Sequence, residues 1–250
     1  MNKLHKIYPL FNSEQFHDAC GVGFVATKNG KPDPKVLPSA LSALQRLTHR
    51  GAKAYDGNSG DGSGILVDIP RKFFCDYLLK KHSLKIPKND TLAIASIFAK
   101  RINDKKIVDN FLDLTKKEKI KFLAIRKVPT DENVLGDFSK KSKPKILQVI
   151  FSTKIRKSSK LERILYLIRK KVEKKLCPKH KRFYICSFSS KTIIYKGLLS
   201  SDQLAKFYKD LNHDLFVVKV ALFHERFSTN TFSSWEMAQP FRMIAHNGEF

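Results

Sequence analysis

Residues 18–27 read Asp-Ala-Cys-Gly-Val-Gly-Phe-Val-Ala-Thr, a short apolar run that opens with a cysteine. Its composition predicts a strand over 20–27. A cysteine at the beginning of such a strand has two interpretations. Cys20 is a buried structural thiol among glycines that allow close packing, or it is a nucleophile held at a strand end. Taken alone, this stretch favours the structural interpretation, so the rest of the chain must decide.

The rest of the chain alternates between strand-like and helix-like segments. Further strands are predicted at 65–69, 91–99, 121–128, 145–151, 182–188, 192–195, 215–223 and 241–245. Helices are predicted at 38–49, 73–81, 105–119, 161–176 and 202–211. Several strands are neighbours in the sequence, which favours antiparallel pairing and layered sheets over a doubly wound fold.

The segment 161–176 carries the clearest helical pattern. Its apolar residues recur on one face, at Leu161, Ile164, Leu165, Ile168 and Val172. Ser159, followed three residues later by Glu162, predicts a capping box at the beginning of this helix.

The composition limits the class of protein. The chain has 250 residues, of which 42% are hydrophobic, so it can bury a sizeable core. The 48 lysines and arginines outnumber the 23 acidic residues and give a net charge of +25. Such a charge is compatible with binding nucleic acid or an anionic membrane. However, the cations are scattered and aromatic residues do not interleave with them, so neither partner is expected.

Export, membrane and metal signals are missing from the sequence. No apolar run approaches the roughly 18 residues of a membrane span, and the N-terminus has no sustained apolar region. The four cysteines show no CxxC spacing, so no metal site is expected. These features favour a reducing, cytoplasmic location.

A glycine-rich loop, Ser59-Gly60-Asp61-Gly62-Ser63-Gly64, follows the string Leu47-Thr48-His49-Arg50-Gly51-Ala52. Such loops cradle phosphate when they lead into a helix N-terminus. This loop leads into the strand predicted at 65–69 and lacks the Gly-Lys-Ser/Thr ending. A tight loop beside a functional site is therefore the better interpretation.

Two further strings contain residues suited to catalysis. Arg226, in His-Glu-Arg-Phe-Ser-Thr-Asn-Thr (224–231), directly follows an apolar segment, where its fork can pair with a carboxylate. Asn247 and Gly248, in Ala-His-Asn-Gly-Glu (245–249), are also a strong hairpin signal. An Asn amide and a Gly N–H presented together can stabilise an oxyanion.

Together these motifs form the parts of an amide-hydrolysing thiol enzyme. Cys20 supplies a nucleophile, Arg226 a carboxylate clamp, and Asn247 with Gly248 an oxyanion hole. No histidine partner is needed if the base is the cysteine's own α-amino group, which titrates near 7.7–8.0. This is the N-terminal nucleophile solution.

At this point the chain strongly resembles the class II glutamine amidotransferase domain of the glutamate synthase large subunit, from Asp18 to Glu249. The resemblance rests on specific strings in the order of the family: CGVGFVA, LQRLTHRGA, SGDGSGILVDIPRKFF, KVPTDENVLG, FYICSFSSKTIIYKGLLS, HERFSTNTFSSWEMAQPFRM and AHNGE. The long stretch between the Cys20 and Arg226 motifs separates the chain from shorter class II members.

The resemblance implies an α+β fold, the αββα sandwich of N-terminal nucleophile hydrolases with antiparallel sheets. It implies a propeptide over 1–19 and an amidotransferase domain over 20–250. L-glutamine is the implied substrate, and the Cys20 thiolate would release ammonia and leave a γ-glutamyl thioester. At positions that match the family motifs, Arg226 is implied to bind the substrate α-carboxylate. Asn247 and Gly248 are implied to form the oxyanion hole. Thr229 is a candidate for the glutamine pocket and Arg50 for supporting the nucleophile.

The resemblance also implies a larger enzyme around this domain. A synthase domain of the same chain would use the ammonia to aminate 2-oxoglutarate, with FMN and an iron–sulfur cluster. An electron-donating small subunit is a further implied partner. No cofactor is expected in the 250 residues themselves.

The chain also departs from the family pattern. It stops at Phe250, where the family continues, and the downstream Asp that would bind the substrate amino group is absent. Ala124-Ile125-Arg126 stands where the family shows Gly-Trp-Arg. These departures predict a C-terminally truncated, incomplete sandwich that has little activity alone and aggregates. The alternatives left open are an inactive remnant of such an enzyme and a basic nucleic-acid-binding module.

Overall fold

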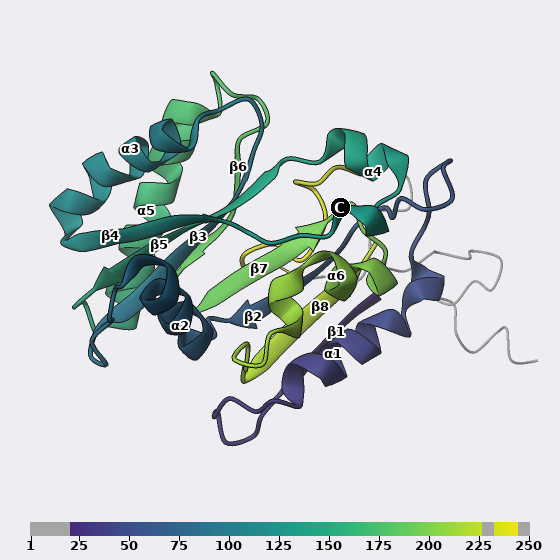
Figure 1. The fold of residues 1–250 in the computed structure, drawn as a ribbon, viewed down its shortest axis with the longest axis horizontal. Helices are drawn as coiled ribbons and strands as arrows, with labels where there is room; N and C mark the ends of the chain where they lie inside the picture. Colours follow the sequence, from purple (N-terminus) through teal and green to yellow (C-terminus); the bar gives the residue numbers. More distant parts are fainter. Residues whose placement is uncertain (1–20, 227–232, 245–250) are drawn as a thin grey trace, which may run out of the picture.

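The computed structural model describes residues 21–226 and 233–244, which form two four-stranded antiparallel sheets (Figure 1). The first sheet has the strand order β1 (Gly21–Ala26), β8 (Val220–Glu225), β2 (Ser63–Asp68) and β7 (Thr192–Gly197). The second sheet has the order β4 (Ile120–Lys127), β5 (Lys145–Thr153), β3 (Thr91–Ala99) and β6 (Tyr184–Ser189). Neither sheet closes on itself.

Helices cover the outer faces of the two sheets, as Figure 1 shows. α1 (Val36–Gln45) packs on β1 and β8 of the first sheet, with α6 (Ser201–Phe207) beside it. α3 (Asp104–Thr115) and α5 (Ser158–Leu176) lie on the second sheet. Two further helices, α2 (Arg71–His82) and α4 (Asp137–Ser142), lie in connections between strands. The expected layering and antiparallel pairing of the αββα sandwich are therefore confirmed.

Alternation along β3 explains how the second sheet is buried on both faces. Ala93, Ala95 and Ile97 belong to the core shared with α3 and α5. Leu92 and Ile94 belong to the larger core that includes residues of the first sheet and of α1, α2 and α6. Because successive strand side chains point to opposite faces, one nearly continuous apolar strand serves both layers.

Most predicted elements are present, but three expectations from the sequence are wrong. The strand expected over 215–223 is Val220–Glu225, because the preceding apolar residues Phe216 and Val218 enter the core from irregular backbone. The strand expected at 241–245 is not formed over 241–244, where the Phe241 N–H instead donates to the Ile244 carbonyl in a turn. Residue 245 lies outside the described residues.

The capping box expected at the beginning of α5 is also not formed. The N-cap of α5 is Lys157, and it makes no side-chain cap hydrogen bond. The Glu162 carboxylate instead accepts hydrogen bonds from Ser189 and Ser190, in the turn between β6 and β7. A tertiary partner has replaced the local one.

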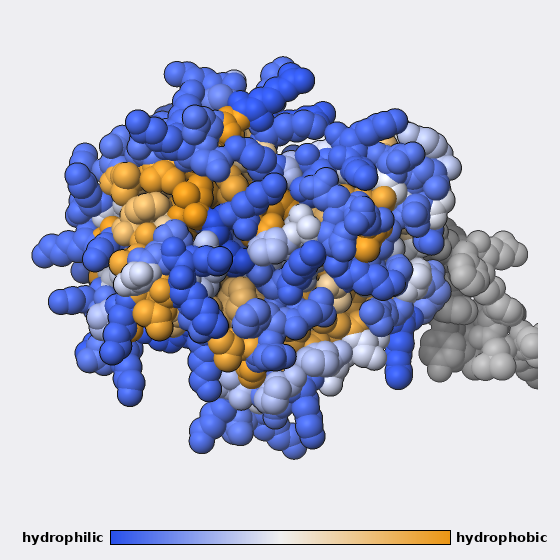
Figure 2. All heavy atoms as spheres, viewed as in Figure 1, coloured by the Kyte–Doolittle hydropathy of each residue, from blue (hydrophilic) through white to orange (hydrophobic). Residues whose placement is uncertain are grey.

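The surface is hydrophilic over most of the face that Figure 2 shows, with apolar side chains in smaller groups between the polar ones. None of the helices among residues 21–226 and 233–244 is long and apolar enough to cross a membrane.

Candidate active site

Four strand ends meet at one end of the first sheet. β1 begins at Gly21, which is paired with Glu225 at the end of β8. Ser63 at the beginning of β2 is paired with the same Glu225 and with Gly197, the last residue of β7. Cys20 is bonded to Gly21 and Arg226 to Glu225, so this sheet end is where the sequence motifs converge.

Of the predicted site residues, Arg226 and Arg50 fall within the described part of the chain. Cys20, Thr229, Asn247 and Gly248 lie outside it. The expected propeptide, 1–19, lies outside it as well.

Arg226 is held tightly by the glycine-rich loop. Its backbone N–H donates to the Gly62 carbonyl at 2.8 Å, and its Nε lies 3.4 Å from Asp61 Oδ2. The arginine has φ +76°, in the left-handed region that costs a residue with a Cβ about 1 kcal/mol. The loop and β8 together therefore fix the position of the Arg226 backbone and of its Nε atom.

Asp61 is a poorly hydrated partner for Arg226. Burial raises the pKa of Asp61 to about 6, although the Ala52 N–H and the charge of Arg226 act in the opposite direction. The Ala52 N–H donates to Asp61 Oδ1 at 3.2 Å. The carboxyl group thus ties the 47–52 segment to the glycine-rich loop and to Arg226.

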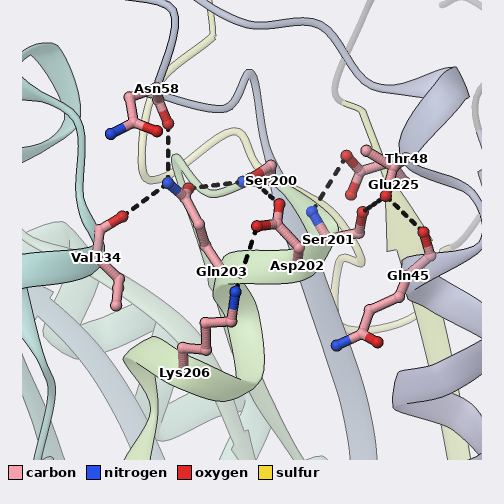
Figure 3. A network of polar contacts seen from close by, with 10 residues as sticks. All are labelled: Gln45, Thr48, Asn58, Val134, Ser200, Ser201, Asp202, Gln203, Lys206 and Glu225. Carbon is pink, nitrogen blue, oxygen red and sulfur yellow. Dashed lines mark hydrogen bonds and ion pairs between the residues drawn. The ribbon is translucent and has the colours of Figure 1, made fainter.

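Glu225 is a functional candidate that the sequence did not single out. It is 1% exposed, and burial raises its pKa to about 8. Its Oε1 accepts a hydrogen bond from the Ser201 N–H at 3.3 Å, at the first turn of α6 (Figure 3). A Cβ on Gly51 would overlap the same oxygen, so this carboxyl group requires glycine there.

The contacts around Glu225 join three segments that are distant in the sequence. Figure 3 shows that Ser201 contacts both Glu225 and Thr48, and the Thr48 hydroxyl lies 2.8 Å from that of Ser201. Gln203 Nε2, two residues further along α6, donates to the carbonyls of Asn58 and Val134. The only sequence signal for Glu225 was its place directly before Arg226.

Arg50 lies in the 3-10 turn Thr48–Arg50, and its side chain is exposed. Its N–H donates to the Leu47 carbonyl. The turn itself is close to the site, because the next residue is Gly51, which lies against Glu225.

The glycine-rich loop packs against protein and leaves no cradle for phosphate. A Cβ on Gly60 would overlap the backbone of Leu199, and one on Gly64 would overlap the Gln239 carbonyl. The loop therefore does not fit the phosphate of FMN or of another nucleotide. Within residues 21–226 and 233–244, no group of three or more His, Cys, Asp or Glu residues could hold a metal, so an iron–sulfur cluster has no ligands there either.

At this sheet end, a strand that begins directly after a cysteine lies beside a strand that is directly followed by an arginine. The chain belongs to the class II glutamine amidotransferases, whose family model matches residues 20–250.

Among individual proteins, the chain is similar to glutamate synthases. It is 41% identical over 250 residues to the ferredoxin-dependent glutamate synthase of Antithamnion sp., covering 97% of this chain. It is 40% identical over 252 residues to the large chain of glutamate synthase [NADPH] of Azospirillum brasilense, and 38% identical over 252 residues to that of Bacillus subtilis. These alignments cover 96% and 99% of this chain, and in all three cases 16% of the relative.

Proposed function

We propose that this chain carries the glutaminase part of a glutamate synthase, which hydrolyses the side-chain amide of L-glutamine. The observation that carries the proposal is the pairing of Gly21 with Glu225. Directly paired residues of antiparallel strands have Cα atoms about 4.5–5.5 Å apart. The neighbours of Cys20 and Arg226 are therefore adjacent, as a nucleophile and a substrate clamp require.

In the proposed reaction, removal of residues 1–19 frees the α-amino group of Cys20, which takes the proton of its own thiol. The thiolate attacks the amide carbon, and the Asn247 amide and the Gly248 N–H stabilise the oxyanion. Ammonia leaves with the proton, and a γ-glutamyl thioester remains. Water then hydrolyses the thioester to glutamate and regenerates the thiol.

Arg226 is proposed to bind the α-carboxylate of glutamine bidentately, with Asp61 orienting the guanidinium through Nε at 3.4 Å. Glu225 is proposed as a positioning residue, since it fixes the strand end that carries Arg226. Thr229 remains a proposed residue of the glutamine pocket and Arg50 a proposed support for the nucleophile.

For the longer protein, we propose the activity that the names of its relatives state. A synthase domain would use the released ammonia to aminate 2-oxoglutarate, with FMN and an iron–sulfur cluster held outside this chain. An electron-donating small subunit and a cytoplasmic location belong to the same proposal. The alternative is a catalytically inactive remnant.

The proposal is tested by ammonia release from glutamine, assayed on the 250-residue chain and on a form extended beyond Phe250. Cys20→Ser should lower the rate at least a hundredfold, since serine supplies negligible nucleophilic anion near neutral pH. Cys177→Ser, at the far end of α5, is the matched control and should leave the rate unchanged.

Three outcomes are informative. Intact mass should show that active protein begins at Cys20, and full activity from a chain that retains Met1 would contradict the processing step. No ammonia release from either form would favour the inactive remnant. Equal losses for both cysteine variants would remove the assignment of Cys20.

An electrophilic glutamine analogue gives an independent test. It should label Cys20 and spare Cys75, Cys177 and Cys186, because burial raises the pKa of each of these three thiols. Equal labelling of all four would favour a structural role for Cys20.

A further inference from the structure

A cleft of about 790 Å³ opens at one end of the second sheet, and none of its lining residues belongs to the candidate active site. Three segments line the cleft: the connection after β3, the C-terminal end of α4, and the connection between α5 and β6. The lining residues are Lys100, Arg101, Lys141, Lys179, His180, Lys181 and Arg182. Figure 1 shows the β3–α3 and α5–β6 connections side by side along the upper edge of the molecule, and Figure 2 shows hydrophilic side chains there.

The lining of the cleft is cationic, and no acidic residue in it neutralises the positive charge. Six of its seven residues are lysine or arginine, and none is acidic. None of the ion pairs found within the described residues involves any of the six. Lys100 Nζ instead donates to the Lys141 carbonyl at 3.3 Å. Lys179, Lys181 and Arg182 are near neighbours in the chain, within the Debye length of about 8 Å, so their charges repel one another.

Two local features indicate that the cleft is a shaped site as well as a charged one. The Nε2 atom of His180 is buried and has no hydrogen-bond partner among the described residues. Arg101 has φ +57°, a left-handed conformation that is uncommon for residues other than glycine. An anion in the cleft would relieve the charge repulsion among its lysines and arginines.

The composition of the lining selects the chemistry of the anion. The cleft has no Phe, Tyr or Trp to stack on a base and no carboxylate to bind a sugar hydroxyl or a metal. It therefore recognises charge and oxygen acceptors, and its volume leaves room for a compact polyanion with its water. We propose that this cleft binds a small polyphosphate anion, about the size of tripolyphosphate, at a site separate from glutamine hydrolysis.

The probe is inorganic tripolyphosphate, titrated calorimetrically into the 250-residue chain at about 0.15 M salt. Saturable binding with one site per chain is expected, with an affinity that falls as salt rises because several ion pairs form. The variant Lys179→Gln/Lys181→Gln/Arg182→Gln should weaken binding at least tenfold.

The matched control removes the same charge elsewhere. Lys116→Gln/Lys117→Gln/Lys157→Gln replaces three exposed lysines beyond the C-terminal end of α3 and the N-terminal end of α5, at the opposite ends of these helices from the cleft. This variant should change the affinity less than twofold.

Equal weakening by the two triple variants, or binding without saturation, would overturn the proposal in favour of a diffuse effect of the +25 charge. Tighter cleft-dependent binding of a hexaglutamate peptide would also overturn it, since the cleft would then be a surface for an acidic segment. Tighter cleft-dependent binding of a thymidine octanucleotide would assign it to nucleic acid instead.

Discussion

Arg226 occupies a position where backbone and side chain are both constrained. Its φ of +76° is held by the hydrogen bond to the Gly62 carbonyl, and its Nε by Asp61. Strained residues of this kind persist where the surroundings over-determine them, which is common at functional sites. The geometry therefore agrees with the proposed role of Arg226 in binding substrate.

Arg226→Lys tests whether Arg226 binds the substrate carboxylate. Lysine keeps the charge but loses the fork that pairs bidentately with a carboxylate. Loss of a charge-assisted hydrogen bond costs about 1.5–3 kcal/mol, so kcat/KM for glutamine should fall about ten- to a hundredfold. The change should appear mainly in KM if the carboxylate is bound equally in the ground and transition states.

The control for this prediction is Arg163→Lys, because Arg163 is exposed on α5. It should leave both kinetic constants unchanged. An enzyme indifferent to Arg226→Lys would remove the carboxylate role from that residue.

Glu225 makes the stability of the protein depend on pH. Its native pKa is raised to about 8 from the ordinary value of 4.5, so between these values the folded state holds a proton that the unfolded state has lost. Stability therefore falls as pH rises from about 5 to 8 and changes little above 8. Burial also raises the pKa of Asp61, which adds to the slope at the lower end of this range.

Glu225→Gln should make that slope shallower, by at most about 1.4 kcal/mol per pH unit, the effect of one proton. The measurement is the free energy of unfolding in urea at pH 5, 6, 7 and 8. Glu118→Gln, at an exposed carboxylate, should leave the slope as it is. An identical slope in wild type and Glu225→Gln would mean that Glu225 is ionised in the folded protein.

At the scale of elements, α5 shows how a tertiary contact competes with a local one. Ser159 and Glu162 have the spacing of a capping box, yet Glu162 accepts hydrogen bonds from the backbone N–H and hydroxyl of Ser190 and from the Ser189 hydroxyl. The carboxylate thereby secures the turn between β6 and β7 to the outer helix. Three partners outweigh the single N–H that the helix offered.

Glu162→Ala should therefore destabilise the protein by about 1–3 kcal/mol, the cost of losing hydrogen bonds to a charged acceptor. Ser159→Ala should change stability by less than about 0.5 kcal/mol, as is usual for surface substitutions without special contacts. Urea unfolding of the two variants gives the comparison. A larger loss of stability for Ser159→Ala than for Glu162→Ala would indicate that the capping box does form.

At the scale of the whole molecule, one buried polar cluster joins the two sheets. Arg126 of β4 donates two hydrogen bonds to Asp210, at 2.7 and 3.0 Å, and one to Gln148 of β5. Tyr195 of β7, in the first sheet, donates to Asp210 and accepts from Gln148. The cluster fixes how the sheets face each other, because each member needs its partners.

Arg126→Met should lower the free energy of unfolding by about 3–5 kcal/mol, since it leaves Asp210 buried without its cation. The double variant Arg126→Met/Asp210→Leu should lose less than the sum of the two single variants, because it removes both charges. Urea unfolding of the full double-mutant cycle measures this coupling. Strict additivity would show that the two side chains do not act as a pair.

The sequence by itself determined the layered antiparallel fold and the motifs of the family. Alternating apolar strands and the 3.6-residue pattern of α5 are local properties, so they are readable from neighbouring residues. Residues of these motifs, such as Cys20 and Arg226, were identifiable because each stands beside a predicted strand in a specific string.

Only the tertiary structure decided which strand ends meet, and therefore which polar groups share an environment. The Glu225 carboxyl lies against Gly51 and Ser201, which are far from it in the sequence, and its raised pKa arises from their joint burial of the group. The cationic cleft likewise combines three connections whose lysines look like ordinary surface residues one by one. The strand order depends on packing between segments far apart in the sequence, and the pattern of a single segment does not show which other segments it will meet.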